Sequence, residues 1–162
     1  MIFISTGSRK FQFDRLIRKV DELVGEGLIE EEVFAQIAET AYVPQHIQYK
    51  RYLLPEEFSE LQKKADLVIT HAGTGALIGA LKKGKQVIAV PRLFKYGEHS
   101  DDHQLQVAGA LEQEGYLRVV LEMDDLYQTI EECKKNPITK TYDKPSNVVP
   151  IIEAKINEWF ER

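Results

Sequence analysis

Residues 66–104 read DLVITHAGTGALIGALKKGKQVIAVPRLFKYGEHSDDHQ. The apolar run 67–70 predicts a buried strand, which enters a small, glycine-rich turn at 71–75. A helical pattern follows, and a second apolar strand at 87–90 ends at Pro91. Ligands bind at the carboxyl ends of the strands in an open α/β sheet. The stretch therefore predicts a parallel sheet with a site for a phosphorylated small molecule at its carboxyl edge.

Strands and helices alternate along the rest of the chain. We expect strands at 2–5, 33–38, 48–53, 67–70, 87–90 and 117–121. We expect helices at 13–24, 55–65, 103–114 and 124–135, besides the one that follows the glycine-rich turn. Such alternation predicts a mostly parallel sheet with right-handed crossovers. The predicted fold class is α/β, with one Rossmann-like domain over residues 1–162.

The end of the chain predicts one more helix, within residues 147–162. Its apolar side chains share one face, and they are Ile152, Ile156, Trp159 and Phe160. This face fits two roles, part of the core or a docking surface for a partner chain.

The composition is ordinary for a globular protein with more acidic than basic residues. The chain has 162 residues, 43% of them hydrophobic, and a formal net charge of -5. Nucleic acid is not an expected partner, because phosphate backbones are usually bound by a basic face. The single cysteine, Cys133, allows no intrachain disulfide and fits a reducing compartment. No apolar run reaches the ~18–20 residues of a membrane span, and no targeting signal is visible, so a cytoplasmic location is expected.

The turn at 71–75 has the chemistry of a phosphate site. Glycine at Gly73 and Gly75 lets the backbone approach a ligand closely, and Thr74 adds a hydroxyl donor. The helix that follows points unpaired N–H groups and its positive dipole end at such a ligand. A diphosphate would fit, although a tight strand-to-helix turn without any ligand would have the same sequence.

A second glycine turn, Thr6-Gly7-Ser8, follows the first expected strand. Neither turn has the three-glycine spacing of a dinucleotide fingerprint, and no Gly-Lys-Ser/Thr run of a P-loop is present. NAD and ATP are therefore disfavoured as ligands. On its own, this second turn fits a structural role better than a functional one.

Polar residues cluster at 98–104, at the start of an expected helix. His99 and His103 are four apart and would share a face of a continuous helix, yet two histidines are fewer ligands than zinc sites use. Asp101 or Ser100 fits a helix cap instead, and Gln104 could reach a sugar or base. The chain also lacks an Asp-x-Asp triplet. We therefore expect no metal site and no cofactor, and helix dipoles and hydroxyls would meet the charge of a diphosphate.

The run DLVITHAGTGALIGALKKGKQVIAVPR at 66–92, with GEHSDDHQLQVA at 97–108, resembles the C-terminal domain of family 28 glycosyltransferases. The chain is more similar still to the donor-binding subunit of the two-part UDP-GlcNAc transferase of N-glycan assembly. It most resembles PssE-like subunits of capsule and exopolysaccharide synthesis, which also open with a strand, a glycine turn and Phe-x-Arg-Leu, as in IFISTGSRKFQFDRLI at 2–17. The resemblance covers residues 1 to about 135.

This resemblance implies a GT-B glycosyltransferase divided at its domain boundary. The chain would equal the C-terminal half and bind the UDP-sugar donor. A second, membrane-anchored subunit would bind the lipid-linked sugar acceptor, and the active site would form between the two. The complex would then lie at the inner face of the plasma membrane.

The resemblance also implies which residues contact the donor. Those implied to face the diphosphate are His71, Gly73, Thr74 and Gly75. Those implied to line the cleft are Gly7 and Ser8, and those near the uracil and ribose are Pro91 and Arg92. Those implied to border the donor sugar and ribose are Glu98, His99, Asp102, His103 and Gln104. Many relatives carry a ribose-associated Glu where this chain has Gly79, so that contact is lost or passes to another residue.

The predicted function is the donor-binding subunit of an inverting UDP-sugar glycosyltransferase of capsule or exopolysaccharide synthesis. Galactose or GlcNAc is the expected sugar, with glucose and glucuronic acid left open. The general base that inversion needs has no clear candidate in the sequence and is expected in the partner subunit. Two alternatives stay open, a non-catalytic activator of a partner transferase and an unrelated nucleotide-binding enzyme such as an epimerase.

Overall fold

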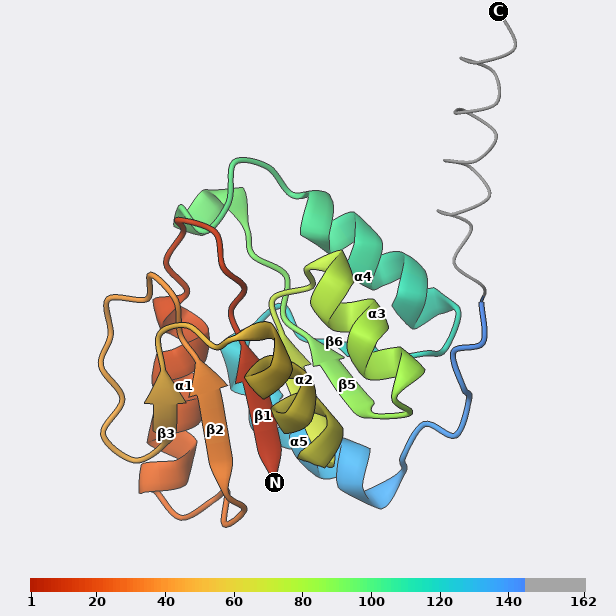
Figure 1. Cartoon of the computed structure of the whole chain (residues 1–162), viewed down its shortest axis with the longest axis horizontal. Coiled ribbons are helices and arrows are strands. Elements are labelled where there is room, and N and C mark those ends of the chain that lie inside the picture. Colours follow the sequence, from red (N-terminus) through yellow and green to blue (C-terminus); the bar gives the residue numbers. More distant parts are fainter. Residues whose placement is uncertain (145–162) are drawn as a thin grey trace, which may run out of the picture.

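The computed structural model describes residues 1–144 and shows one parallel sheet (Figure 1). Its strand order is β3-β2-β1-β4-β5-β6, and every neighbouring pair is parallel. The strands are β1 (Ile2–Ser5), β2 (Val33–Gln36), β3 (Gln48–Lys50), β4 (Leu67–Thr70), β5 (Gln86–Ala89) and β6 (Arg118–Val119). This order confirms the predicted Rossmann-like α/β fold.

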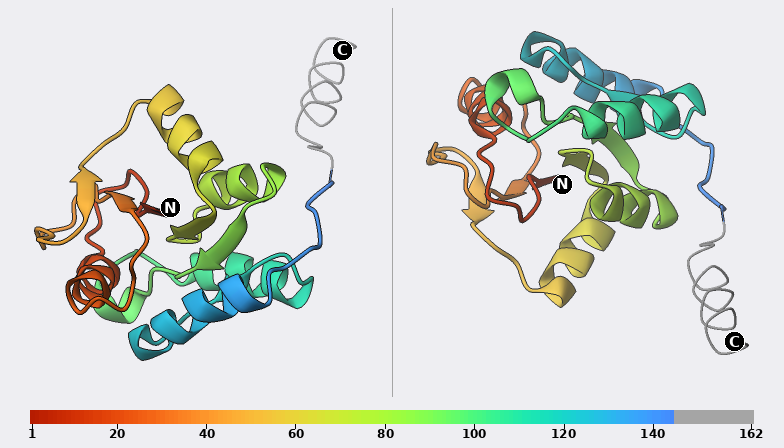
Figure 2. Two further views of the ribbon diagram at one scale, coloured as in Figure 1. Left: turned by 90° about the horizontal axis from the view of Figure 1, so that it is seen from below. Right: turned by 90° about the horizontal axis from the view of Figure 1, so that it is seen from above.

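Helices cover both faces of the sheet, with α1 and α5 on one side and α2 and α3 on the other (Figure 2). The α-helices are α1 (Asp14–Gly25), α2 (Pro55–Lys64), α3 (Thr74–Lys82), α4 (His103–Gln113) and α5 (Leu126–Lys135). Two short 3-10 helices are η1 (Phe94–Tyr96) and η2 (Met123–Asp125). Within the described residues, no helix is both long enough and apolar enough to cross a membrane.

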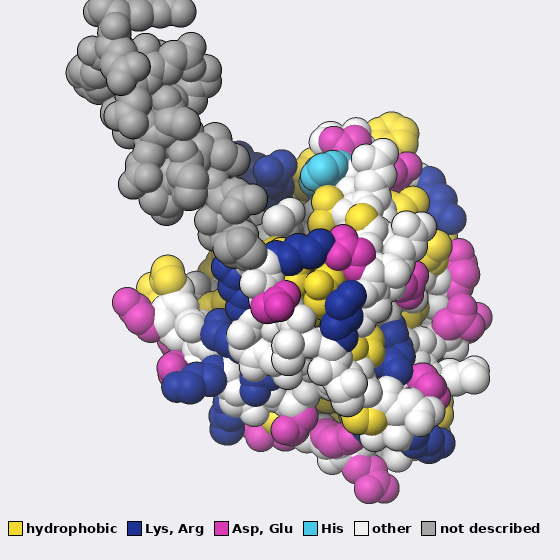
Figure 3. Space-filling view, turned by 90° about the vertical axis from the view of Figure 1, so that its right-hand side faces the viewer, with side chains coloured by type: hydrophobic (Ala, Val, Ile, Leu, Met, Phe, Trp, Pro, Cys, Tyr) yellow, Lys and Arg dark blue, Asp and Glu magenta, His cyan; other side chains and the backbone are white. Residues whose placement is uncertain are grey.

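Alternation along the strands divides the core into two layers. In β1, Ile2 and Ile4 pack with α1 and α5, while Phe3 packs with α2 and α3. Ala108 of α4 joins the layer that contains Phe3. Strands buried on both faces need apolar residues at every position, which explains the continuous apolar runs. On the face in Figure 3, basic and acidic side chains lie interspersed.

The observed strands are shorter than predicted at three places. The strand expected at 33–38 ends at Gln36, and the backbone turns at Ala38, where φ is 44°. The strands expected at 48–53 and 117–121 shrink to Gln48–Lys50 and Arg118–Val119. Both are edge strands, which have a pairing partner on one side only. The helix expected within 147–162 lies outside the described residues.

A buried carboxylate on α1 holds the loop that follows β2. Asp21 is 1% exposed and accepts hydrogen bonds from the backbone N–H groups of Gln45, His46 and Ile47 and from the hydroxyl of Tyr42. Burial opposes its ionisation, but these hydrogen bonds outweigh burial and lower the pKa of Asp21. The loop is therefore held to α1 by an ionised group.

We predict that Asp21→Asn destabilises the fold by about 2 kcal/mol, because an amide NH2 would face backbone donors in place of a carboxylate oxygen. The lowered pKa also means that this stabilisation is present above the unfolded pKa and is lost as pH falls through the folded pKa. Urea unfolding followed by circular dichroism at pH 7 and pH 3 measures both effects. The matched control is Glu22→Gln, which changes an exposed carboxylate on the same helix.

A wild-type free energy of unfolding in Asp21→Asn would contradict this account. So would an equal loss of stability between pH 7 and pH 3 in the wild type and in Asp21→Asn.

Candidate functional site

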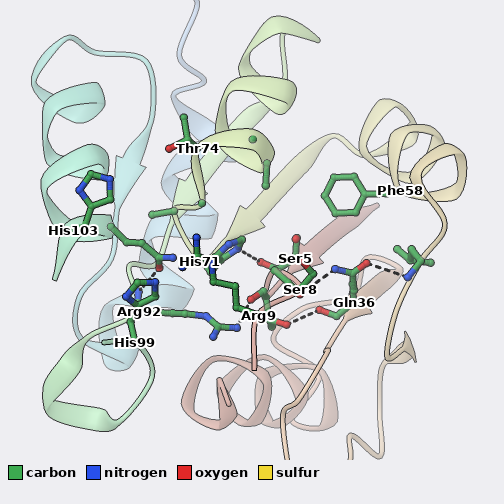
Figure 4. Close-up of a pocket in the computed structure, with 18 of the residues that line it drawn as sticks. Ser5, Ser8, Arg9, Gln36, Phe58, His71, Thr74, Arg92, His99 and His103 are labelled. Atoms are coloured by element: carbon green, nitrogen blue, oxygen red, sulfur yellow. Dashed lines mark hydrogen bonds between the residues drawn. The ribbon is translucent and has the colours of Figure 1, made fainter. Parts of the chain in front are cut away.

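A cavity of about 830 Å³ lies at the carboxyl edge of the sheet (Figure 4). Its wall comes from residues 5–9 after β1, the end of β2, residues 53–58 around the start of α2, the turn 71–76, and the segment between β5 and α4. The predicted site residues that line it are Gly7, Ser8, His71, Gly73, Thr74, Gly75, Arg92, His99, His103 and Gln104. Segments far apart in the sequence thus meet in one place, as expected for parallel strands.

Two turns with left-handed backbone lie next to each other at the cavity wall, after the paired strands β1 and β4. Gly7, after β1, has a φ of 83°, and Ala72, after β4, has a φ of 65°. A positive φ strains an alanine, and such strain often marks a functional site. The backbone after Ala72 then turns at Gly73 and begins α3 at Thr74.

The imidazole of His71 fills the space between these turns. A Cβ added at Gly73 would lie 2.2 Å from His71 Nε2, and one added at Gly7 would lie 2.6 Å from the same atom. A Cβ added at Gly75 would meet nothing. Gly73, which was predicted to let the backbone approach a ligand, is therefore needed to accommodate a side chain of the protein itself, and so is Gly7.

His71 is neutral at physiological pH in this position. Its Nδ1 lies 3.2 Å from the carbonyl oxygen of Ser5, and because a carbonyl only accepts, Nδ1 carries the proton of the neutral ring. Burial and the nearby charge of Arg92 lower the pKa of His71 to about 4, with a smaller contribution from Arg9. His71 thus positions the turns without adding charge to the cavity.

The start of α3 presents hydrogen-bond donors to the cavity. Gly73 is the N-cap and offers no side-chain cap, so the N–H groups of the first turn are not capped by it. The hydroxyl of Ser5, 1% exposed at the end of β1, also has no hydrogen-bond partner. Free N–H groups at a helix start suit an anion.

Another part of the cavity wall is apolar, and its residues were not among the predicted site residues. It consists of Leu53, Pro55 and Phe58 around the start of α2. Gln36, at the end of β2, donates to Gly7 O at 3.2 Å and accepts from Leu53 N at 3.1 Å, so it joins this wall to the loop after β1. The strand pattern could have indicated this part of the wall, because β2 and β3 also end at the carboxyl edge of the sheet.

Arg92 serves the protein's own structure. Its guanidinium donates to the carbonyl oxygens of Thr6, Phe11 and Glu98, and the side chain is 1% exposed. Burial lowers the pKa of Arg92 to about 10, and it remains a cation at neutral pH. Arg92 lines the cavity, and its guanidinium is bound to the loop after β1 and to the carbonyl of Glu98.

Three predicted site residues do not line the cavity. The carboxylate of Glu98 is ion-paired with Arg15 at 2.6 Å and accepts from Leu93 N at 3.0 Å. Asp102 accepts from Phe94 N at 2.9 Å, and the carbonyl of Pro91 accepts from Arg15 at 2.7 Å. The hydrogen bonds of Glu98, Asp102 and Pro91 hold the segment after β5 in place. Their positions do not support the contacts with sugar, uracil and ribose that were expected of them.

The remaining polar cluster lies at the start of α4. Asp101 accepts from the N–H of His103 at 2.9 Å, but the N-cap of α4 is Asp102, which makes no side-chain cap hydrogen bond, so the cap expected at Asp101 or Ser100 is wrong. The side chain of Gln104 accepts from Arg92 N at 3.1 Å. Because α4 begins at His103, His99 lies before the helix and stacks on Phe11 instead of sharing a helix face. Among residues 1–144, no group of three His, Cys, Asp or Glu side chains could hold a metal ion.

Gly79 lies on the side of α3 that faces α2. A Cβ there would lie 3.1 Å from the side-chain oxygen of Gln62. This oxygen accepts from Lys83, and the side-chain NH2 of Gln62 donates to the carbonyl of Ala76. Gly79 does not line the cavity, so the position offers no substitute for the carboxylate found in relatives.

We predict that the neutral His71 makes stability depend on pH. Its folded pKa of about 4 lies below the 6.5 that is usual for histidine, so the unfolded chain binds a proton first as the pH falls. Stability is therefore complete above about pH 6.5 and declines towards pH 4, by up to about 3 kcal/mol. Urea unfolding at several pH values should show a shallower decline in His71→Gln.

The exposed His103 provides the matched control, because His103→Gln should keep the wild-type slope. Equal slopes in His71→Gln and the wild type between pH 4.5 and 6.5 would show that His71 titrates normally in the folded protein.

Comparisons with known proteins show the family to which this chain belongs. Residues 1–156 match the model of the Glycosyltransferase family 28 C-terminal domain. The human UDP-N-acetylglucosamine transferase subunit ALG13 is 32% identical over 125 residues, which cover 72% of this chain and 10% of that protein. The subunit of the same name from Cryptococcus neoformans is 31% identical over 96 residues, which cover 58% of this chain and 43% of the relative.

A solved structure shows the same fold. Spinosyn forosaminyltransferase SpnP superposes with a TM-score of 0.63 at 19% identity, over 96% of this chain and 43% of that one. The likeness places the fold with the C-terminal, Rossmann-like half of GT-B glycosyltransferases. This chain spans less than half the length of each of these relatives. By the match over residues 1–156, the chain belongs to the glycosyltransferase family 28 C-terminal domain family.

Proposed function

We propose that this chain binds the UDP part of a UDP-sugar donor and forms one half of a two-part, inverting glycosyltransferase. The observation that carries the proposal is a single open cavity with an anion-binding helix start on one wall and an apolar surface on the other. Such a pairing suits a ligand that has a diphosphate at one end and a flat base at the other. The names of the two ALG13 relatives support UDP-GlcNAc as the class of donor.

We propose an order for the parts of the donor along the cavity. We place the diphosphate against the first turn of α3, near Thr74 and Ser8, and the uracil against the apolar wall at Leu53 and Phe58. The uracil position replaces the one expected at Pro91 and Arg92. The sugar would then lie on the side of α4, near His103.

The general base belongs, in this proposal, to a second subunit. Inversion requires a base that removes the proton of the acceptor hydroxyl. His71 is poorly suited to this task, because its pKa of about 4 makes it a weak base and its ring is enclosed between Gly7 and Gly73. The second subunit would also bind a lipid-linked acceptor and carry the membrane anchor, at the inner face of the plasma membrane.

The biological setting that we propose is capsule or exopolysaccharide synthesis, with GlcNAc or galactose as the sugar. The support is the resemblance of the opening residues 2–17 to PssE-like subunits. In the structure, Arg15 of this stretch binds Glu98 and the carbonyl of Pro91, which holds the segment after β5. The motif therefore has a structural role beside the donor cavity.

We predict that the purified chain transfers sugar only when its partner subunit is present. Radiolabelled UDP-GlcNAc and UDP-galactose are incubated with lipid-linked acceptor and with this chain, the partner, or both. Product should form only with both, because this chain alone lacks the base and the acceptor side of the cleft, and the partner alone lacks the donor side. Robust transfer by this chain alone would contradict the proposal, and conversion of the UDP-sugar without acceptor would indicate an epimerase.

We predict that UDP binds to the isolated chain and that Gly73→Ala weakens this binding at least about tenfold. The added Cβ would lie 2.2 Å from His71, which must move at a cost of about 1–3 kcal/mol and distort the helix start. Isothermal titration calorimetry with UDP measures the change. Gly109→Ala is the control, because a Cβ in that part of α4 meets nothing and should leave the affinity unchanged.

No heat of binding at millimolar UDP would favour the activator over the donor-binding subunit. Wild-type affinity for UDP in Gly73→Ala would show that UDP binding does not depend on how His71 packs against Gly73. It would overturn the placement of the diphosphate at the start of α3.

A further inference from the structure

The charged side chains that line the cavity differ in what they already bind. Arg92 donates to three backbone carbonyls. Asp101 accepts from the N–H of His103 and lies 3.2 Å from the ring of His99. Arg9 is exposed at the cavity wall, and its guanidinium makes no hydrogen bond, ion pair or aromatic contact within residues 1–144.

The position of Arg9 follows from the turn after β1. Gly7 has a φ of 83°, and the chain then runs past the cavity at Ser8 and Arg9. Figure 4 shows Arg9 near His71, among the residues that line the cavity. The charge of Arg9 also contributes to the lowered pKa of His71, so it acts where the two turns meet.

We propose that Arg9 binds the diphosphate of the donor and supplies the cation of this site. This inference rests on the proposed UDP-sugar function and adds a residue that neither the sequence motifs nor the family match assigns. The start of α3 lies across the same cavity and contributes roughly half an elementary charge. A diphosphate carries more charge than that, and a guanidinium can bind two of its oxygens at once.

Arg9 would also make the site selective for the diphosphate over the nucleoside. Uracil binds the apolar wall at Leu53 and Phe58 in our proposal, on a different side of the cavity from Arg9. Loss of the guanidinium should therefore weaken binding of the phosphates and leave nucleoside binding intact.

The test compares UDP with uridine on four folded proteins, the wild type, Arg9→Met, Arg9→Lys and Lys10→Met. Lys10 is the matched control, because it is an exposed neighbour of the same charge that does not line the cavity. Calorimetry measures UDP, NMR titration measures uridine, and thermal melting confirms the fold of each variant.

We expect Arg9→Met to weaken UDP binding roughly ten- to hundredfold, the loss typical of a charge-assisted hydrogen bond. Arg9→Lys should recover part of the loss, because it keeps the charge without the planar fork. Lys10→Met should stay within about twofold of the wild type, since an exposed charge outside the cavity is screened by salt. Uridine binding should be equal in all four proteins.

Wild-type UDP affinity in Arg9→Met would overturn the role of Arg9 and leave the proposed function standing. An equal loss of uridine binding in Arg9→Met would also overturn it, because Arg9 would then support the cavity as a whole. Failure of the wild type to bind both UDP and uridine would overturn the proposed function and the role of Arg9 together.

Discussion

The cavity depends on the buried guanidinium of Arg92. It joins the loop after β1, through the carbonyls of Thr6 and Phe11, to the segment after β5, through the carbonyl of Glu98. Removing it would leave buried carbonyl oxygens without a donor, which costs more than the net worth of each hydrogen bond. Two of the segments that line the cavity are thus joined by a residue whose two terminal guanidinium nitrogens already donate to backbone carbonyls.

The second constraint is the close fit of His71 between two glycine turns. Because Gly7 and Gly73 leave room for the imidazole alone, the loop after β1 and the start of α3 keep a set separation. The free N–H groups of α3 therefore face the cavity before any ligand arrives. A site formed in advance loses less conformational freedom when the ligand binds.

The sequence predicted the sheet and the carboxyl edge, because apolar runs and glycine turns report directly on burial and backbone shape. It could not show that Arg92 and Glu98 serve the fold. A charged residue after a strand gives the same sequence pattern whether its side chain binds a ligand or a buried carbonyl. Only the packing of loops that are distant in the sequence distinguishes these two roles. The apolar wall at Leu53 and Phe58 was missed for a related reason, since its residues look like ordinary core positions.

The central claim is that a diphosphate occupies the space between the start of α3 and the loop after β1. A crystal structure of the chain soaked with UDP tests this directly. The account predicts phosphate oxygens within hydrogen-bond distance of the N–H groups of Thr74 and Gly75, with the uracil on Phe58. UDP bound with its phosphates elsewhere on the protein, or with the base at the start of α3, would contradict it.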